Sequence, residues 1–291
     1  MNAAHVTEVS GIERPGRHMP IDRGVPFPRR VQRWFGRNLL RLFVVLVFAY
    51  LFTPIAYITV FSFNDGGRSN IVWQGFTLSN WTNPCRSPEL CPAVGNSLEI
   101  GVISTFLATL LGTMIAYALS RYRFRGRTIT NLLIFLPMAT PEVVMAASLL
   151  TLFLNLRVNL GFTTIVVAHV MFCVSFVVVA VKARIASLDP RLEQAAMDLY
   201  ANEAQAFRKV TLPLLAPGIA GAALLAFSLS FDDFIVTTFN SGNVNTFPKF
   251  VYVAAKRGVP PEAYVVGAGM FYLALLLAVL AEVLRQVRAR A

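Results

Sequence analysis

Residues 42–63 read LFVVLVFAYLFTPIAYITVFSF, a stretch without a single charged residue. A helix of this length rises about 33 Å, at about 1.5 Å per residue, which is enough to cross the roughly 30 Å of hydrocarbon in a bilayer. The run is longer than the apolar core of a cleavable signal peptide, and a long polar leader precedes it. It therefore predicts a transmembrane helix.

Five further windows have the same apolar character, at residues 97–120, 131–153, 161–181, 215–239 and 264–284. The window at residues 131–153, the third along the chain, is the least regular, because Pro137, Pro141 and Glu142 interrupt it. Over the whole chain 56% of residues are hydrophobic and 14% are charged, against about 25% charged in an average soluble domain. This composition excludes a soluble enzyme, a disordered tail protein and a disulfide-stapled secreted domain. We expect an all-α integral membrane protein with six transmembrane helices.

The basic residues orient the expected bundle. With the N-terminus in the cytoplasm, 20 of the 26 Lys and Arg residues fall on the cytoplasmic side, as the positive-inside rule requires. Both termini are then cytoplasmic. The net charge of +11 lies in patches beside the windows, which fits anchoring to membrane lipid better than binding to nucleic acid.

The chain divides into a leader at residues 1–38 and a six-span domain at residues 39–291. The leader is basic and rich in proline, and we expect its start to be disordered. Residues 29–41 interleave arginines with apolar residues, a pattern that predicts a short interfacial helix.

The positions of the three cysteines indicate structural roles and no catalytic or metal-binding role. Cys173 lies within the fourth window and reads as a small apolar filler. Cys85 and Cys91 lie in the first outside loop, where a disulfide is plausible in an oxidising compartment. A two-cysteine metal site is the other reading, but neither a histidine nor a further cysteine stands nearby. We expect a structural disulfide and no metal site.

The longest internal cytoplasmic loop, at residues 182–214, reads KARIASLDPRLEQAAMDLYANEAQAFRKVTLPL. Asp189-Pro190 is a helix-start signal, and the apolar residues of 191–199 fall on one helical face. We expect a short amphipathic helix there, a second short helix at 202–210, and an entry into the fifth span set by Pro213 and Pro217. Such a hairpin could pack beneath the bundle, or it could present its first helix to a soluble partner.

This loop resembles the EAA loop of importer-type ABC permeases, in which Glu-Ala-Ala is followed by Gly-Ala and then by Phe and Leu-Pro. Gln194 stands where that family has Glu, and Tyr200 stands where it has Gly. Because Tyr adopts a positive φ only at a cost, we expect the inter-helix turn to differ or another residue to carry the bend. The resemblance assigns coupling to an ATPase to Glu193, Gln194, Ala195, Ala196, Asp198, Tyr200, Ala201, Phe207 and Pro213.

The resemblance implies a type I ABC importer permease in the bacterial inner membrane. The chain has no GxxxxGK[ST] phosphate-binding loop, so it is expected to be a transport subunit and not an enzyme. ATP and Mg would be used by a separate ATPase, and no cofactor would bind this chain. The implied partners are a second homologous permease subunit, two copies of an ATP-binding subunit and an extracytoplasmic solute-binding protein.

Four carboxylates in the second, third and fifth windows have no Lys or Arg within those windows to balance them, namely Glu99, Glu142, Asp232 and Asp233. Each costs at least about 2.5 kcal/mol in lipid and is a functional candidate by default. The alternative is that they are protonated or bonded to neighbouring hydroxyls and amides, which we favour for Glu99. For two adjacent aspartates, it is hard to find enough neighbouring hydroxyls and amides to hydrogen-bond both carboxylates. Together with Glu142, at its proline break, they predict an acidic cavity for a cation.

The solute is suggested by a second resemblance. The run SFDDFIVT at residues 230–237 and the later motifs NSG and TFP are similar to the PotC-type family of spermidine/putrescine permeases. This implies a polyamine as the solute, with ferric ion or thiamine as alternatives; an ion channel or secondary transporter would not need the EAA-like loop. Aromatic walls would suit a polyamine, although aromatic residues in spans more often serve packing. The candidate pathway residues are Asp232, Asp233, Glu142, Phe231, Phe234 and Tyr272, with Phe239 as a further aromatic candidate.

Overall fold

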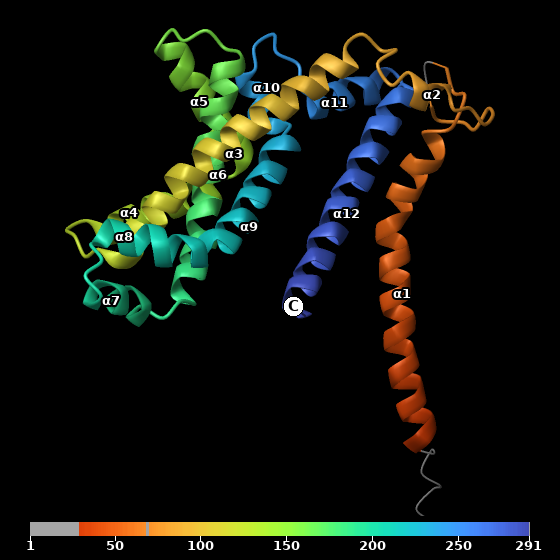
Figure 1. Cartoon of the computed structure of the whole chain (residues 1–291). Coiled ribbons are helices and arrows are strands. Elements are labelled where there is room, and N and C mark those ends of the chain that lie inside the picture. The colour runs from red at the N-terminus through yellow and green to blue at the C-terminus, as the bar shows by residue number, and fades with distance from the viewer. Residues whose placement is uncertain (1–28, 68–69, 291) are drawn as a thin grey trace, which may run out of the picture. The chain divides into compact units, whose positions relative to one another are not determined.

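The computed structural model describes residues 29–67 and 70–290, which form helices joined by loops (Figure 1). The elements are α1 (Arg29–Phe61), α2 (Ser79–Thr82), α3 (Leu90–Arg121), α4 (Arg127–Ala139), α5 (Glu142–Asn155), α6 (Phe162–Ala186), α7 (Arg191–Asp198), α8 (Glu203–Ala206), the π-helical η1 (Phe207–Thr211), α9 (Leu212–Phe231), α10 (Ile235–Asn240), α11 (Phe247–Arg257) and α12 (Pro261–Arg290). The chain forms two compact units, residues 1–54 and residues 55–291.

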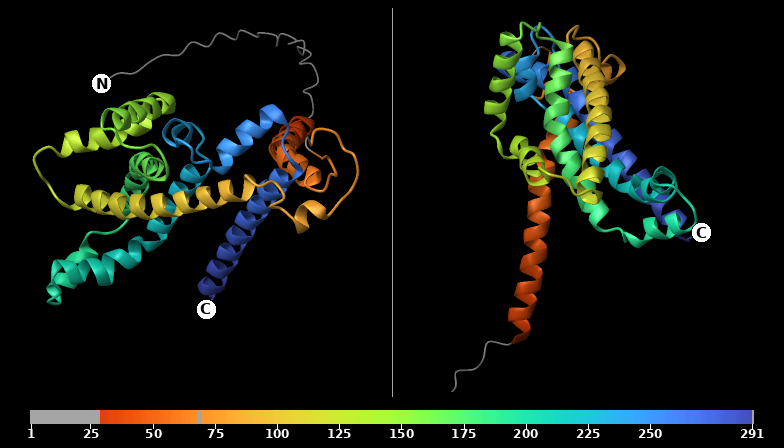
Figure 2. Two further views of the ribbon diagram at one scale, coloured as in Figure 1. Left: turned by 90° about the horizontal axis from the view of Figure 1, so that it is seen from above. Right: turned by 90° about the vertical axis from the view of Figure 1, so that its left-hand side faces the viewer.

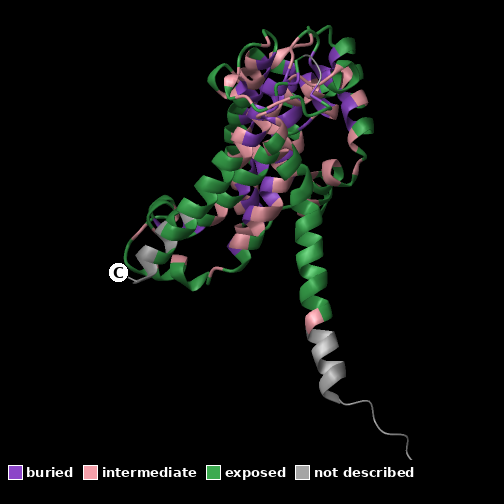
Figure 3. Cartoon of the chain, turned by 90° about the vertical axis from the view of Figure 1, so that its right-hand side faces the viewer, coloured by how far each residue is buried: buried purple, intermediate pink, exposed green. Residues whose placement is uncertain are grey.

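The described part of the first unit is the beginning of α1. Its side chains from Leu39 to Pro54 are exposed (Figure 3), and they are almost all apolar. A helix that is apolar all round suits a lipid environment. Because α1 runs without a break from Arg29, the expectation of a separate interfacial helix at residues 29–41 is wrong. Residues 1–28 of the expected leader lie outside the described residues.

Five stretches are long and apolar enough to cross a membrane, and they agree with five of the six expected windows. They are Asn38–Phe61, Leu90–Arg121, Phe162–Ala186, Glu203–Phe231 and Pro261–Leu280. A sixth is reached only if α4 and α5 are taken together as one broken span.

The third window is broken at its prolines, as the sequence indicated. Its halves α4 and α5 meet at an angle of 107°. Thr140, between them, is extended with a ψ of 133°. A proline disfavours the helical conformation of the residue before it, and Pro141 follows Thr140, which explains the break.

The fifth window differs from the prediction at both ends. It ends at Phe231 and not at residue 239, because residues 232–234 interrupt the helix before α10 begins. At its start, α8, η1 and α9 run on as one apolar stretch from Glu203. The second loop helix is therefore continuous with the span. Pro213 lies in the first turn of α9, as expected, whereas Pro217 lies inside that helix.

The main core of the second unit lies where α3 packs against α6 and α9 (Figure 2). Small residues allow the close approach of α3 and α6. A Cβ atom on Gly112 would lie 2.6 Å from Cγ1 of Val177, so only glycine fits there without a shift. Cys173 is buried in this core as a free cysteine, as expected.

The N-terminal end of α3 is held by a disulfide and an ion pair. Cys85 and Cys91 are joined by a disulfide, which agrees with the structural bridge suggested by their spacing. Between them, Arg86 lies 3.7 Å from the carboxylate of Glu262. A small apolar cluster of α3, α11 and α12 lies next to this bridge, around Leu90 and Phe250.

Candidate functional site

The break between α9 and α10 places its two adjacent aspartates in different surroundings. Asp233 is buried, with 6% of its surface exposed. Its carboxylate accepts hydrogen bonds from the backbone amide of Thr237 at 2.7 Å and from the hydroxyl of the same residue at 2.8 Å. A further bond of 3.3 Å comes from the amide of Val236. Asp233 thus satisfies the free amides at the start of α10.

His169 of α6 completes the environment of Asp233. Its Nε2 atom lies 3.1 Å from Oδ2 of Asp233 and 3.0 Å from the hydroxyl of Thr237, and its Nδ1 atom lies 2.7 Å from the hydroxyl of Ser230. All four residues are buried. Buried polar groups are stable when they are bonded in this way. The structure therefore gives Asp233 partners within the chain, which is the alternative considered above for acids within the spans.

Glu142 lies at the break between α4 and α5, in the first turn of α5, and is half-buried. Its carboxyl group lies near that of Asp233, because α5 packs against α10. The structure thus brings Glu142 and Asp233 together, as predicted, although the second of them is already enclosed by His169 and Thr237.

Asp232 does not share the buried surroundings of Asp233. It is exposed and lines a groove of about 490 Å³. In this groove the rings of Phe231 and Phe247 lie 6.3 Å apart, and those of Phe234 and Tyr252 lie 4.4 Å apart. The complete lining is Phe231, Asp232, Phe234, Phe247, Pro248, Val251, Tyr252 and Ala255.

Two of the predicted aromatic residues lie elsewhere. The hydroxyl of Tyr272, on α12, lies 3.0 Å from the hydroxyl of Thr59 on α1. Phe239 packs against the apolar cluster of α5, α6 and α10. Neither residue lines the groove at Asp232.

In the loop between α6 and α9, Tyr200 itself carries the bend. Its φ is +64°, so the expectation that the turn would differ or that another residue would take this role is wrong. The amide of Tyr200 donates to the carbonyl of Met197, and that of Ala201 donates to the carbonyl of Ala196. This is the Schellman arrangement that ends many helices, with Tyr200 in the position usually held by glycine. Asn202 then caps α8 through reciprocal bonds with Gln205.

The first loop helix presents most of its candidate coupling residues outward. Gln194, Ala195 and Asp198 are exposed, and Tyr200 is 99% exposed. Phe207 instead packs on the ring of Tyr117, with 4.7 Å between the ring centres. The outward residues are free to contact a partner, whereas Phe207 fixes the loop to α3.

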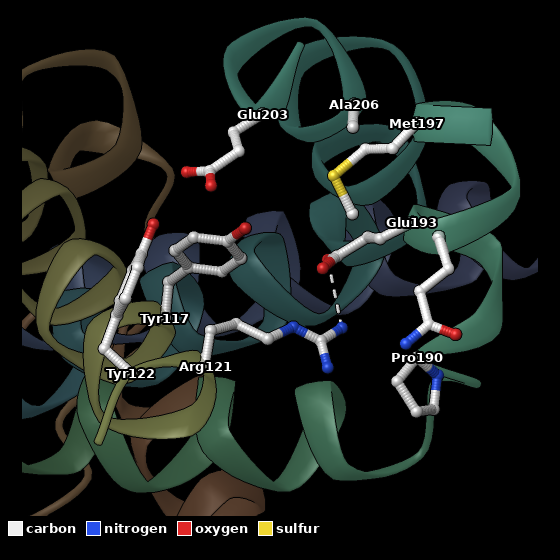
Figure 4. A pocket seen from close by; sticks show the side chains of 9 residues that line it. Tyr117, Arg121, Tyr122, Pro190, Glu193, Met197, Glu203 and Ala206 are labelled. Carbon is white, nitrogen blue, oxygen red and sulfur yellow. Dashed lines mark hydrogen bonds and ion pairs between the residues drawn. The ribbon is translucent and has the colours of Figure 1, made fainter. Parts of the chain in front are cut away.

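Glu193 differs from its neighbours because it points toward the bundle. Its carboxylate accepts a bond of 3.0 Å from Arg121 at the end of α3 and one of 2.6 Å from the hydroxyl of Thr211 in η1. The ion pair borders a cavity of about 240 Å³ between the end of α3 and the two loop helices (Figure 4). Glu193 therefore joins α7 to the two helices that continue into the apolar bundle.

Comparison with known proteins identifies the family. The family of binding-protein-dependent transport system inner membrane components matches residues 108–289. The chain belongs to this family. A relative, the spermidine/putrescine transport system permease protein PotC of Escherichia coli strain K12, is 38% identical over 250 residues, covering 86% of this chain and 94% of that protein. The putrescine permease PotI of the same strain is 36% identical over 235 residues, covering 78% of this chain and 83% of that protein.

Solved structures show that this family member has an ABC permease fold. The chain aligns with a TM-score of 0.63 to a bacterial alginate ABC transporter crystallised with an alginate-bound periplasmic protein, at 16% identity, covering 87% of this chain and 94% of that chain. It aligns with a TM-score of 0.56 to the methionine ABC transporter MetNI, at 16% identity, covering 70% of this chain and 96% of that chain.

Two functional candidates in this binding-protein-dependent permease escaped the sequence reasoning. Tyr252 lies in the groove, and the ammonium group of Lys256 lies 4.5 Å from the centre of its ring. The spacing of these two residues, four apart on a helix, was the available signal. The pairing of His169 with Asp233 was not predicted, since nothing local in the sequence links the two residues.

Proposed function

We propose that this chain is one permease subunit of an ATP-driven importer for polyamines. The observation that carries the proposal is the groove that combines the carboxylate of Asp232 with four aromatic rings. The names of the relatives support the same solute class.

The chemistry of the groove fits a linear polyamine. Asp232 would pair with one ammonium group, and the rings of Phe231, Phe234 and Tyr252 would cover the methylene chain and attract a second ammonium group through their faces. Lys256 already places an ammonium group over Tyr252 at 4.5 Å, so this ring face accepts a cation. A ferric ion has no methylene chain and would gain nothing from the apolar walls.

The architecture of the subunit follows from counting α4 and α5 as one broken span. Six spans would leave both termini on one side of the membrane, and the distribution of basic residues makes this side the cytoplasm, with residues 39–291 as the permease domain and residues 1–38 as a basic leader. The subunit would reside in the bacterial inner membrane, pair with a second homologous permease and receive solute from an extracytoplasmic binding protein. The periplasmic protein in the alginate transporter structure supports the last point.

Two copies of a separate ATPase would dock on the loop at residues 191–201. The exposed side chains from Gln194 to Tyr200 would make the contact. Glu193 would carry movement of α7 to Arg121 on α3 and to Thr211 on the helix that continues into α9. Phe207 and Pro213 would hold the junction between this loop and the span.

Uptake of labelled spermidine tests the proposal. The comparison uses cells lacking the gene, complemented cells, and cells with Asp232→Asn or Asp232→Glu. We expect uptake to require the gene, to fall at least about ten-fold with Asn, and to recover in part with Glu, because the carboxylate provides the charge. Asp65→Asn, which neutralises an exposed aspartate in the first outer loop, should leave uptake unchanged.

Competition identifies the solute class. Unlabelled putrescine should compete with spermidine, whereas thiamine and ferric ion should not. Deletion without any effect on spermidine uptake, in a strain with no second polyamine importer, would refute the polyamine assignment. Uptake that survives Asp232→Asn would instead refute the groove as the binding site.

A further inference from the structure

The cavity at the cytoplasmic end of α3 has a composition that its role in coupling does not explain. On one side stand Tyr117 and Tyr122, whose rings lie 6.4 Å apart at an angle of 78°. On the other side stands Glu203, in the first turn of α8. Figure 4 shows the Glu203 carboxylate and the two tyrosine hydroxyls directed into the same space.

The charges in this cavity leave one carboxylate free. Arg121 and Glu193 neutralise each other through their contact of 3.0 Å. Glu203 takes part in none of the ion pairs found among the described residues. The cavity therefore carries one net negative charge beside two aromatic rings. A carboxylate and aromatic faces together form a site for an organic ammonium ion.

The apolar side chains fit the rest of such a ligand. Met197 of α7 and Ala206 of α8 also line the cavity and could cover methylene groups. A hydrated metal ion would gain nothing from them, and an anion would be repelled by Glu203. The volume of about 240 Å³ is large enough for an aminoalkyl chain and too small for a folded peptide segment.

We propose that this cavity is a second, cytoplasmic binding site for an alkylammonium ion, held by Glu203, Tyr117 and Tyr122, through which imported amine slows the transporter. The identity of the natural ligand as a polyamine rests on the proposed function; the cation chemistry of the cavity does not.

The position of the cavity explains how binding would act on transport. Its walls come from three segments, namely the end of α3, the helix α7 and the helix α8. A ligand that touches both Tyr122 and Glu203 favours the arrangement in which these segments are close. Because a ligand shifts an equilibrium toward the state that it binds best, movement of α7 relative to α3 becomes less favourable. Transport that needs this movement is then inhibited by its product.

The test uses the assembled importer in proteoliposomes with its ATPase side facing outward. Solute-loaded binding protein is enclosed in the lumen, spermidine is added only outside, and the initial rate of ATP hydrolysis is measured. We expect external spermidine to inhibit hydrolysis. Glu203→Gln and Tyr122→Leu should raise the half-inhibitory concentration about three- to ten-fold, without changing the rate in the absence of external spermidine.

Matched variants separate this site from general charge effects. Tyr122→Phe keeps the aromatic ring and should be inhibited like the wild type. Phe124→Leu removes another exposed aromatic residue, two positions away and outside the cavity, and should also behave like the wild type. Sodium chloride of equal ionic strength replaces spermidine in a parallel series, and inhibition by spermidine must exceed that of the salt.

The inference fails if external spermidine does not inhibit the wild type, or if Glu203→Gln and Tyr122→Leu are inhibited equally. The latter result would place an inhibitory site on another subunit. Failure of the proposed function has a different signature, since lumenal binding protein loaded with spermidine would then not stimulate hydrolysis. Basal hydrolysis would still report the effect of external spermidine on the cavity.

Discussion

The Nε2 atom of His169 lies 3.1 Å from Oδ2 of Asp233, and each side chain is 2% exposed. This contact joins α6 to the break between α9 and α10. Removing one partner of a buried, hydrogen-bonded pair leaves a polar or charged group without compensation, at a cost of about 3 kcal/mol. We therefore expect His169→Leu to lower the thermal unfolding temperature of the detergent-solubilised protein and its yield in the membrane.

A double-mutant cycle checks the pairing. Asp233→Asn should destabilise less than His169→Leu, because a neutral amide is cheaper to bury than a carboxylate. The double variant should be more stable than the sum of the two single effects predicts. Strict additivity would show that the two residues act independently.

The ion pair of Arg121 and Glu193 should couple ATP hydrolysis to transport. We expect Glu193→Gln to retain ATP hydrolysis by the assembled importer and to reduce uptake, because α7 would lose its charged contact with α3. Exchanging the two residues, Arg121→Glu with Glu193→Arg, should restore part of the uptake. The measurement is the ratio of solute transported to ATP hydrolysed, and an unchanged ratio in Glu193→Gln would contradict the role.

Tyr200 holds a left-handed conformation at φ +64° while its side chain is 99% exposed. Glycine adopts this conformation without the clash of a Cβ atom, and little packing would be lost. We expect Tyr200→Gly to stabilise the solubilised protein by about 0.5–1 kcal/mol, measured as a rise in unfolding temperature. Leu199→Gly is the matched control. That residue has a φ of −90°, so glycine there should bring a loss or no change.

Gly112 and Gly95 both lie within α3 and offer a comparison of packing. A Cβ on Gly112 would lie 2.6 Å from Val177, whereas one on Gly95 would meet nothing within 4 Å. Gly112→Ala should lower the unfolding temperature, with a cost of about 1–3 kcal/mol from overpacking. Gly95→Ala should be neutral or should stabilise by up to about 1 kcal/mol. Val177→Gly removes both Val177 atoms that would lie within 3.0 Å of the new Cβ, so it should offset part of the overpacking cost of Gly112→Ala, and no offset would place the clash elsewhere.

Lys256 should compete with a cationic solute for the face of Tyr252. Replacing it with glutamine removes the resident ammonium group, and we expect the apparent KM for spermidine uptake to fall about two- to five-fold. Arg257→Gln removes a neighbouring positive charge without a ring contact and serves as the control. An equal effect of both variants would indicate general electrostatic attraction instead of competition at the ring.

The sequence by itself determined the fold class, most of the apolar spans and the place of the loop helix at residues 191–198. These features depend on local composition and on capping signals such as Asp189-Pro190, which act within one helix length. The irregular third window was also visible, because Pro141 restricts the residue before it wherever it occurs. The size of the bend at that point, 107°, came only from the structure.

Only the tertiary structure decided the surroundings of Asp232 and Asp233. The two are equivalent in composition and adjacent in sequence, but α9 ends between Phe231 and Asp232 and changes the direction of the chain. Asp233 then meets His169, which lies 64 positions away in the chain, and Asp232 meets aromatic rings of α11. The same holds for Tyr200, whose positive φ is imposed by the Schellman bonds before it and the Asn202 cap after it. Hydropathy is a sum over neighbours in sequence, whereas the surroundings of a side chain depend on which distant segments pack beside it.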